Sequence, residues 1–170
     1  MSLNDISLRA LEPSDIKILL EIENNTSYWK YSNRTEPYSL DLLEKYVDQQ
    51  VQDIFQARQK KFVITNLKKA TVGFIDLFEF EPIHRRAGVG IIINENDHGK
   101  GFGRYAIKLL GNYAKQHLNI NCLFANIAIE NEISILAFEA CGYKKVGLKK
   151  AWNFYQDKFH DEYLYQKLFT

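Results

Sequence analysis

The chain has 170 residues, with 22 Lys and Arg against 21 Asp and Glu and a formal charge of +1. This length can bury a core without disulfide or metal support, and 46% hydrophobic with 25% charged residues excludes a disordered chain. No apolar stretch approaches the ~20 residues that cross a bilayer, and the N-terminus lacks the basic start and apolar run of a signal peptide. Cys122 and Cys141 are too few for a disulfide framework. We therefore expect a single cytoplasmic domain over residues 1–170.

Charge is distributed unevenly along the chain. Residues 12–53 carry nine acidic and four basic side chains, so the remainder is basic. An acidic N-terminal part can hold a cationic ligand, and a basic body can hold an anionic one. Solvated helix faces would give the same pattern, so charge alone does not separate the two interpretations.

The first half of the chain predicts two helices and four strands. The expected elements are a strand at 3–10, a helix opening at 12–15, an aromatic-rich loop after 24–27, a helix from Ser39 with Leu43, Tyr46, Val47 and Ile54 on one face, and strands at 62–64, 72–80 and 87–93. The residues at 68–70 predict a hairpin turn. Because residues 87–93 are apolar on both faces, this strand is expected at the centre of the sheet.

The second half predicts the longest helix of the chain, at 101–117. A strand at 122–129 and a helix at 131–141 follow, and the second helix is expected to end at a left-handed Gly142. The residues expected to face inward from it are Ile133, Leu136, Ala137 and Ala140. Two final strands, at 143–154 and 158–168, are expected to be joined through 155–157.

A glycine-rich loop lies between the central strand and the longest predicted helix. Gly99, Gly101 and Gly103 alternate along it. Free N–H groups and the dipole at a helix N-terminus bind phosphate, and glycine lets a ligand approach the backbone closely. A tight strand-to-helix turn that simply needs glycine would give the same pattern.

Three kinds of phosphate-binding loop compete for this stretch. A P-loop requires Ser or Thr after Gly-Lys, but Gly101 follows Lys100. A dinucleotide fingerprint requires an acidic residue about 20 positions further on, which is lacking. The third kind is the pyrophosphate loop of acyl-CoA transferases, Gln/Arg-x-x-Gly-x-Gly/Ala, which here reads His98-x-x-Gly101-x-Gly103.

With this loop, the chain resembles the GNAT superfamily of N-acetyltransferases over nearly its whole length. Asn131-x-x-Ser134, before a helix that ends in Cys-Gly-Tyr, is similar to the later CoA-side motif of that family. Asp161-x-Tyr163 resembles the branch that acetylates polyamines and the N-termini of ribosomal proteins. Within this branch, the segments most similar to bacterial spermidine N-acetyltransferases are 8–12, 24–25, 36–38, 84–87 and 91–93.

The resemblance implies an α/β fold, with a mixed, mostly antiparallel sheet that is flanked by helices and splayed at the acetyl-CoA site. It implies acetyl-CoA as co-substrate and no metal. The pantetheine arm would lie along residues 91–93, and the pyrophosphate on the N–H groups of 99–104. The implied cofactor-binding residues are Ile91, Ile92, Ile93, His98, Gly99, Lys100, Gly101, Phe102, Gly103, Arg104 and Asn131.

The acceptor amine arrives as an ammonium and must lose a proton before it attacks, which a carboxylate acting through water can accomplish. Glu36, Asp76 and Glu79 match acidic positions of the spermidine branch. Because Asp76 and Glu79 are an odd number of residues apart, only one of them is expected to line the cleft unless a bulge intervenes. We predict a catalytic role for Glu79 and substrate-binding roles for Asp76 and Glu36; a surface acid is the alternative.

The chain departs from the family pattern at three positions. His98 replaces the usual Gln or Arg, and Thr35 replaces the first of two glutamates. Phe138 stands where many members carry a Tyr that protonates the departing thiolate. Loss of a general acid typically costs about 10²–10⁴-fold in rate, so it slows such an enzyme without abolishing the reaction. Ser134 is the candidate to act in its place; the alternative is an ordinary serine at a helix N-terminus.

These observations predict an acetyl-CoA-dependent N-acetyltransferase that acts on a primary amine, a polyamine-like small cation. Two alternatives stay open. One is acetylation of the N-terminal α-amine of a (ribosomal) protein, and the other, suggested by Phe138, is an acyl-CoA-binding protein with impaired catalysis. The expected partners are a small amine and further copies of the chain in a homo-oligomer, with neither nucleic acid nor membrane.

Overall fold

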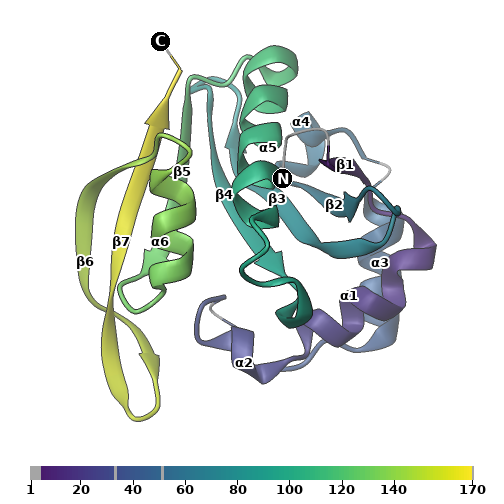
Figure 1. Ribbon diagram of the computed structural model, residues 1–170, viewed down its shortest axis with the longest axis horizontal. Helices are drawn as coiled ribbons and strands as arrows, with labels where there is room; N and C mark the ends of the chain where they lie inside the picture. Colours follow the sequence, from purple (N-terminus) through teal and green to yellow (C-terminus); the bar gives the residue numbers. More distant parts are fainter. Residues whose placement is uncertain (1–4, 33, 51, 170) are drawn as a thin grey trace.

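The structure is a computed structural model that describes residues 5–32, 34–50 and 52–169. In these residues, seven strands form one sheet in the order β1-β2-β3-β4-β5-β7-β6 (Figure 1). The strands β4 and β5 run parallel, and the other neighbours are antiparallel. The strands are β1 (Ile6–Ala10), β2 (Lys60–Asn66), β3 (Thr71–Glu81), β4 (Arg86–Ile93), β5 (Cys122–Ala128), β6 (Lys144–Tyr155) and β7 (Lys158–Leu168).

The α-helices are α1 (Ile16–Glu23), α2 (Thr26–Trp29), α3 (Leu40–Gln49), α4 (Ile54–Ala57), α5 (Phe102–Leu118) and α6 (Glu132–Glu139). Side chains that accept from free backbone amides cap α2, α3, α4 and α6, whereas α1 and α5 begin without a side-chain cap. The Ser39 hydroxyl accepts from the Leu42 amide at the start of α3, and the Asp53 carboxylate accepts from the Phe55 amide at the start of α4. None of the helices in the described residues is long and apolar enough to cross a bilayer.

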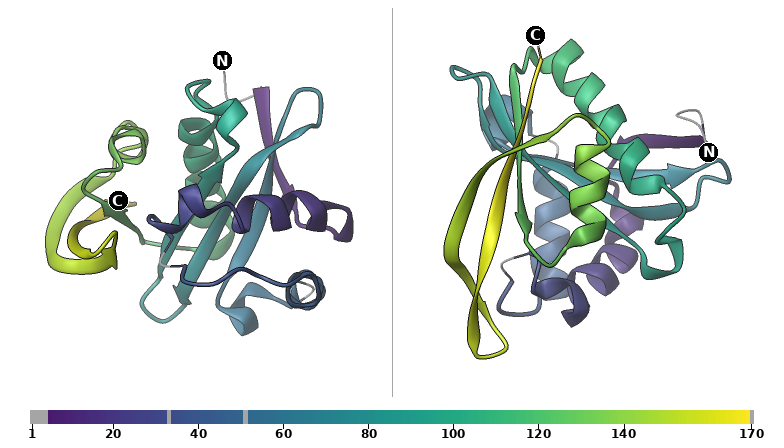
Figure 2. Two further views of the ribbon diagram at one scale, coloured as in Figure 1. Left: turned by 90° about the horizontal axis from the view of Figure 1, so that it is seen from below. Right: turned by 60° about the vertical axis from the view of Figure 1, so that its left-hand side comes forward.

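Helices cover both faces of the sheet, and alternation along the strands divides the core in two. Val63 and Phe74 pack with the buried side chains of α1 and α3. Their neighbours Ile64 and Ile75 belong to the larger cluster on the opposite face, which includes α5 and Phe138 of α6. Figure 2 shows α1 and α3 on one side of β2 to β4 and α5 on the other.

The strands β4 and β5 part shortly after they pair. Their register joins Arg86–Gly88 to Cys122–Phe124 and ends there, and Figure 1 shows the two strands diverging below this point. The Phe78 ring fills the place of a side chain at Gly88, where an added Cβ would lie 2.3 Å from the ring. The same ring packs edge-on against Phe124 at 5.7 Å. The end of the β4–β5 pairing confirms the predicted splay of the sheet, and an aromatic pair occupies the point where the two strands separate.

Most predicted elements are confirmed, with two corrections before β2. The segment expected to be an aromatic-rich loop contains the short helix α2, which the Asn25 side chain caps by accepting from the Ser27 amide. The second predicted helix does not extend to Ile54, because α3 ends at Gln49 and Ile54 begins the separate helix α4. The predicted left-handed cap at Gly142 is confirmed, with φ of 85°.

The inward face predicted for α6 is wrong. Ile133 and Leu136 are 72% and 67% exposed, whereas Phe138 is 3% exposed and joins the main core. Ala140 is exposed as well, and Ala137 is partly buried. Because α6 has apolar residues around most of its circumference, helical spacing fits two faces equally well. Packing of the Phe138 ring against Tyr143, with ring centroids 4.9 Å apart, selects the observed face.

We predict that Gly73→Ala lowers the free energy of unfolding by about 1–3 kcal/mol, the usual cost of overpacking. Gly73 lies opposite Ile93 in the β3–β4 ladder, and a Cβ there would lie 2.2 Å from the Ile92 carbonyl oxygen, which belongs to the backbone and cannot move aside. The matched control is Gly147→Ala, whose Cβ would make ordinary contact with Leu164 at 3.7 Å. Urea unfolding measures both variants, and equal free energies would contradict the close approach of β3 and β4.

Candidate active site

The free edge of β4 forms one wall of the candidate site. Ile91, Ile92 and Ile93 pair with β3 on one side, and on the other side they lie beyond the last residues that pair with β5. Their backbone groups on that edge are therefore outside the β4–β5 ladder. The Ile93 carbonyl oxygen at the end of the strand accepts hydrogen bonds from the Tyr28 hydroxyl (3.1 Å) and His98 Nε2 (2.7 Å).

The glycine loop follows directly and opens α5. Gly99 and Gly101 have φ of 73° and 81°, in the left-handed region that favours glycine. The first intrahelical bond runs from the Tyr105 amide to the Gly101 carbonyl. The preceding amides, those of Phe102, Gly103 and Arg104, have no acceptor within the helix, so the loop offers the donors that phosphate binding requires.

Two side chains of the loop have partners within the protein. His98 Nε2 bonds a carbonyl oxygen, so the ring proton lies on that nitrogen and a neutral His98 has no second donor for a phosphate. Lys100 Nζ lies 2.9 Å from Asp97 Oδ1 but keeps half of its side chain exposed. The backbone of the loop is therefore better suited than His98 to hold an anion.

The start of α6 shows what the Asn131-x-x-Ser134 spacing does locally. The Asn131 side-chain oxygen accepts from the Ser134 amide at 3.2 Å, which is the geometry of an N-cap. Ser134 is half-buried in the first turn, and Phe138 lies one turn further on within the main core. Capping accounts for Asn131 and for the position of Ser134.

A cleft of about 800 Å³ opens between the first helices and the middle of the sheet. It reaches from α1, α3 and the loop before α3 across β2, β3 and β4 to β5 and β7. Aromatic walls are provided by Tyr31, Tyr38, Tyr46 and Phe78. The ionisable side chains that line it are Glu23, Arg34, Lys45, Lys61, Asp76, Glu79 and Glu162. Ile91 and Ile92 also line it, so the free edge of β4 borders the cleft.

Asp76 and Glu79 both line this cleft, so the prediction that only one of them would do so is wrong. The physical reason is a β-bulge. The β3–β4 register shifts between Phe78 and Glu81, and Glu79 has φ of 47°. The extra residue turns Glu79 to the face that Asp76 already occupies. Glu36 is exposed and does not line the cleft, although its carbonyl oxygen accepts from Arg34 (3.4 Å).

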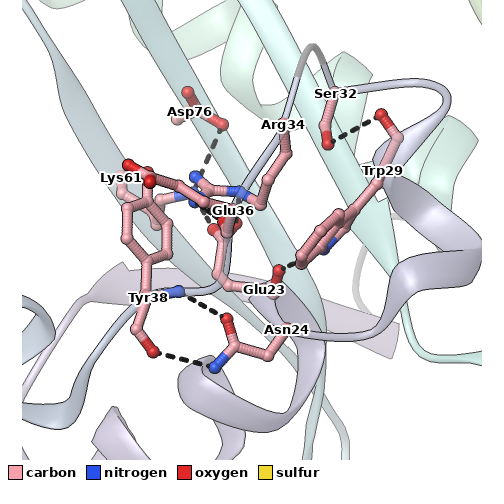
Figure 3. Close-up of polar contacts among 9 residues, drawn as sticks. All are labelled: Glu23, Asn24, Trp29, Ser32, Arg34, Glu36, Tyr38, Lys61 and Asp76. Atoms are coloured by element: carbon pink, nitrogen blue, oxygen red, sulfur yellow. Dashed lines mark hydrogen bonds and ion pairs between the residues drawn. The ribbon is translucent and has the colours of Figure 1, made fainter. Parts of the chain in front are cut away.

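Charged side chains gather at the inner end of the cleft (Figure 3). Lys61 Nζ lies 3.2 Å from Glu23 Oε1 and 3.8 Å from Asp76 Oδ1. Burial alone would lower the pKa of Lys61, but the charges of Asp76 and Glu23 outweigh it, so the pKa is raised and the ammonium persists. Burial raises the pKa of Asp76, and Lys61 offsets this only in part. Burial likewise raises the pKa of Tyr46 to about 12.

The loop before α3 is held over the cleft by Asn24. Its side chain donates to the Tyr38 carbonyl oxygen (2.9 Å) and accepts from the Tyr38 amide (2.7 Å). The guanidinium carbon of Arg34 lies 3.3 Å from the centre of the Tyr38 ring, and Arg34 Nε lies 3.9 Å from Glu23 Oε2. Figure 3 shows Arg34, Tyr38 and Glu23 gathered around Lys61. Asn24 thus holds the backbone of Tyr38, whose side chain lines the cleft.

Sequence reasoning missed Glu23, Arg34, Lys61 and Tyr46. Glu23 was counted only as part of the acidic N-terminal region, and a lysine in a strand carries no motif. Lys61 lies opposite Asp76 in the β2–β3 register, which depends on the exact hairpin and on an irregularity at Ile64 and Thr65. In the described residues, no three His, Cys, Asp or Glu side chains are grouped to hold a metal ion.

The chain matches the acetyltransferase (GNAT) domain family over residues 5–144. It belongs to the GNAT acetyltransferase family. This confirms the predicted family and the predicted activity class, an N-acetyltransferase. The α/β fold expected for the family, a mostly antiparallel sheet flanked by helices, is confirmed as well.

Relatives of this GNAT acetyltransferase span most of its length. It is 32% identical over 148 residues to a spermidine N(1)-acetyltransferase of Vibrio cholerae, covering 85% of this chain and 82% of that protein. A spermidine N(1)-acetyltransferase of Escherichia coli is 30% identical over 151 residues, covering 86% and 76%. A crystal structure of the Vibrio cholerae spermidine N-acetyltransferase with CoA and spermine superposes with a TM-score of 0.90 at 27% identity, covering 97% and 96% of the two chains.

We predict that the free energy of unfolding of Glu79→Val is about 1–2 kcal/mol lower than that of Glu79→Gly, because a β-branched residue is strained in the left-handed conformation of the bulge. Urea unfolding measures the difference. Glu81 is the matched control, since it pairs with Arg86 in the β3–β4 ladder and has no positive φ, so valine is favoured over glycine there. If the valine variant is more stable than the glycine variant at both positions, Glu79 is not in the bulge.

Proposed function

We propose that this GNAT acetyltransferase transfers the acetyl group of acetyl-CoA to a primary amine of a small cation of the polyamine type. One observation carries the proposal: the free edge of β4 leads into the glycine loop at one end and borders the acidic and aromatic cleft along its length. A thioester that arrives from the glycine loop and an amine that arrives from the cleft could therefore both reach the backbone of β4. The similarity to spermidine N-acetyltransferases, one of them solved with CoA and spermine, supports this choice of substrates.

On the cofactor side, the backbone does most of the binding in this proposal. The amides of 99–104 would hold the pyrophosphate, with the charges of Lys100 and Arg104 added to them. The backbone of Ile91–Ile93 would hold the pantetheine arm. Acetyl-CoA supplies the activated acetyl group, and an N–H of this strand placed beside the thioester carbonyl would stabilise the charge that develops on its oxygen.

On the acceptor side, Glu79 is the proposed proton acceptor. An alkyl ammonium has a pKa near 10.4, so a group at the site must take its proton before attack. Within the described residues, Glu79 is a cleft carboxylate without an ion pair, whereas Asp76 and Glu23 are engaged by Lys61. Asp76, as the partner of Lys61, would contribute to substrate binding at the inner end of the cleft, and Glu36 would attract cations from outside the cleft. Ser134 is proposed to assist the departing sulfur, directly or through water.

We also propose that the chain forms a homo-oligomer. The outer hairpin of β6 and β7 exposes large apolar side chains, those of Trp152, Phe154 and Phe159. Exposed apolar patches of this kind mark interaction surfaces. A spermidine N-acetyltransferase of Vibrio cholerae with a TM-score of 0.82 and 30% identity has been solved as a dodecamer.

The experiment that tests the proposal measures thiol release from acetyl-CoA. We predict release with spermidine at a rate that falls as salt rises, because charge steers a polycation to the cleft and salt screens it. Gly103→Val should weaken acetyl-CoA binding about tenfold or more. A Cβ added at Gly103 would lie 3.8 and 3.7 Å from the side chains of Ile91 and Ile93, so the extra bulk of valine lies between the glycine loop and the strand proposed to hold the pantetheine arm.

The control is Gly111→Val in the same helix, where an added Cβ meets Phe169 at 3.7 Å and not the glycine loop. If a peptide α-amine is acetylated and spermidine is not, the proposed acceptor is a protein N-terminus and not a polyamine. Binding of acetyl-CoA without turnover of any amine would favour the binding-protein alternative. Unchanged acetyl-CoA affinity in folded Gly103→Val would refute the cofactor site.

We predict that Phe138→Tyr raises kcat near neutral pH by supplying a proton donor to the leaving sulfur. The CoA thiol resembles cysteine, with a pKa of about 8.5, so the gain should shrink as the pH approaches that value and the thiolate leaves without a proton. The ratio of kcat between variant and wild type across pH 6.5–9.5 measures this (roughly two units below to one above that pKa). A ratio that does not vary with pH would show that residue 138 does not protonate the sulfur.

A further inference from the structure

A resident ammonium occupies the inner end of the acceptor cleft. Lys61 extends from β2, and its side chain is only 13% exposed. Its Nζ lies within 4 Å of Glu23 and Asp76, on α1 and β3, and 6.0 Å from the centre of the Phe74 ring. This arrangement of two carboxylates and an aromatic face is one that a substrate ammonium would also seek.

The position of Lys61 is fixed by the sheet. It lies directly opposite Asp76 in the β2–β3 ladder, and its amide donates to the Gln50 side-chain oxygen at 3.2 Å. Arg34, from the loop above, adds a second positive charge near Glu23. The two inner carboxylates are thus compensated by two cations of the protein itself.

The outer part of the cleft has a different charge balance. Glu79 makes no ion pair or hydrogen bond within the described residues and is exposed. The cleft therefore offers one uncompensated carboxylate near the β3 bulge, while its inner end is close to neutral. An acceptor with one ammonium can be accommodated at Glu79, but a further ammonium directed inward meets the like charge of Lys61.

We propose that Lys61 is a specificity-determining residue: its ammonium takes the inner cation subsite and disfavours acceptors that bring a second positive charge into the cleft. The inference rests on the proposed function and narrows its substrate class. A polyamine binds with its outer ammonium groups toward the rim, and an amine with a single charge and an apolar body gains from the tyrosine walls without meeting Lys61.

The test compares Lys61→Met with the wild type on n-butylamine, 1,4-diaminobutane and spermidine. Methionine keeps the length of the side chain and removes its charge. The kcat/KM of spermidine relative to butylamine should rise by about tenfold, the effect of one close charge pair, and mainly through a lower KM. Lys61→Arg keeps the charge and should keep the wild-type ratio.

Two controls separate specificity from general effects. Lys60→Met removes a charge from the adjacent residue of β2, whose Nζ donates to the Gln50 carbonyl outside the cleft, and should leave the ratio within about twofold of wild type. Lys61→Met leaves the Asp76 carboxylate without its partner, and adding Asp76→Asn removes this carboxylate. The rise in the kcat/KM of spermidine relative to butylamine should then be lost. If Lys61→Met does not fold, Lys61→Gln still offers hydrogen bonds to both carboxylates and replaces it.

Spermidine binding by calorimetry, with CoA present, gives the same comparison without turnover. Tighter spermidine binding to Lys61→Met than to the wild type is expected. An unchanged or lower spermidine preference in both assays, in a variant that still binds acetyl-CoA, overturns the role of Lys61. Absence of acetylation in every variant, with the calorimetric difference present, overturns the proposed function and leaves the inner cation subsite standing.

Discussion

The separation of β4 from β5 is the constraint on which the rest of the site depends. Parallel strands normally continue side by side, but here the Phe78 ring lies over Gly88 and against Phe124 at the last paired residues. Beyond this point the backbone of Ile91–Ile93 has a free edge. Both the glycine loop and the cleft border that edge, so the place proposed for the meeting of the two substrates is set by an aromatic pair and a glycine.

The charge balance of the cleft depends on the positions of a few backbone atoms. The bulge in β3 turns Glu79 onto the same face as Asp76, and the β2–β3 register places Lys61 opposite Asp76. A cleft that looks acidic by composition is therefore compensated at its inner end and negative near the bulge. The charges that line the cleft therefore act together with the number of charges on a ligand to select the cations that can bind there.

Several sequence signals that look functional act first on local structure. Asn24 fixes the loop before α3 through both hydrogen bonds to Tyr38, and Asn131 caps α6. His98 bonds the end of β4 at the Ile93 carbonyl. These side chains position the backbone that would contact the substrates, which is a sufficient physical reason for their place in the chain.

The family, most of the elements and the glycine loop can be predicted from the sequence, because they depend on local spacing: apolar period, capping side chains and glycine at positive φ. The sequence also names Asp76 and Glu79 as candidate site residues. Long-range packing was needed to show that both face one cleft, that Phe138 and not Leu136 turns inward, and that Lys61 pairs with Glu23. Each of these depends on a bulge, a ring contact or a strand register, which joins residues distant in the chain and leaves no periodic trace in the sequence.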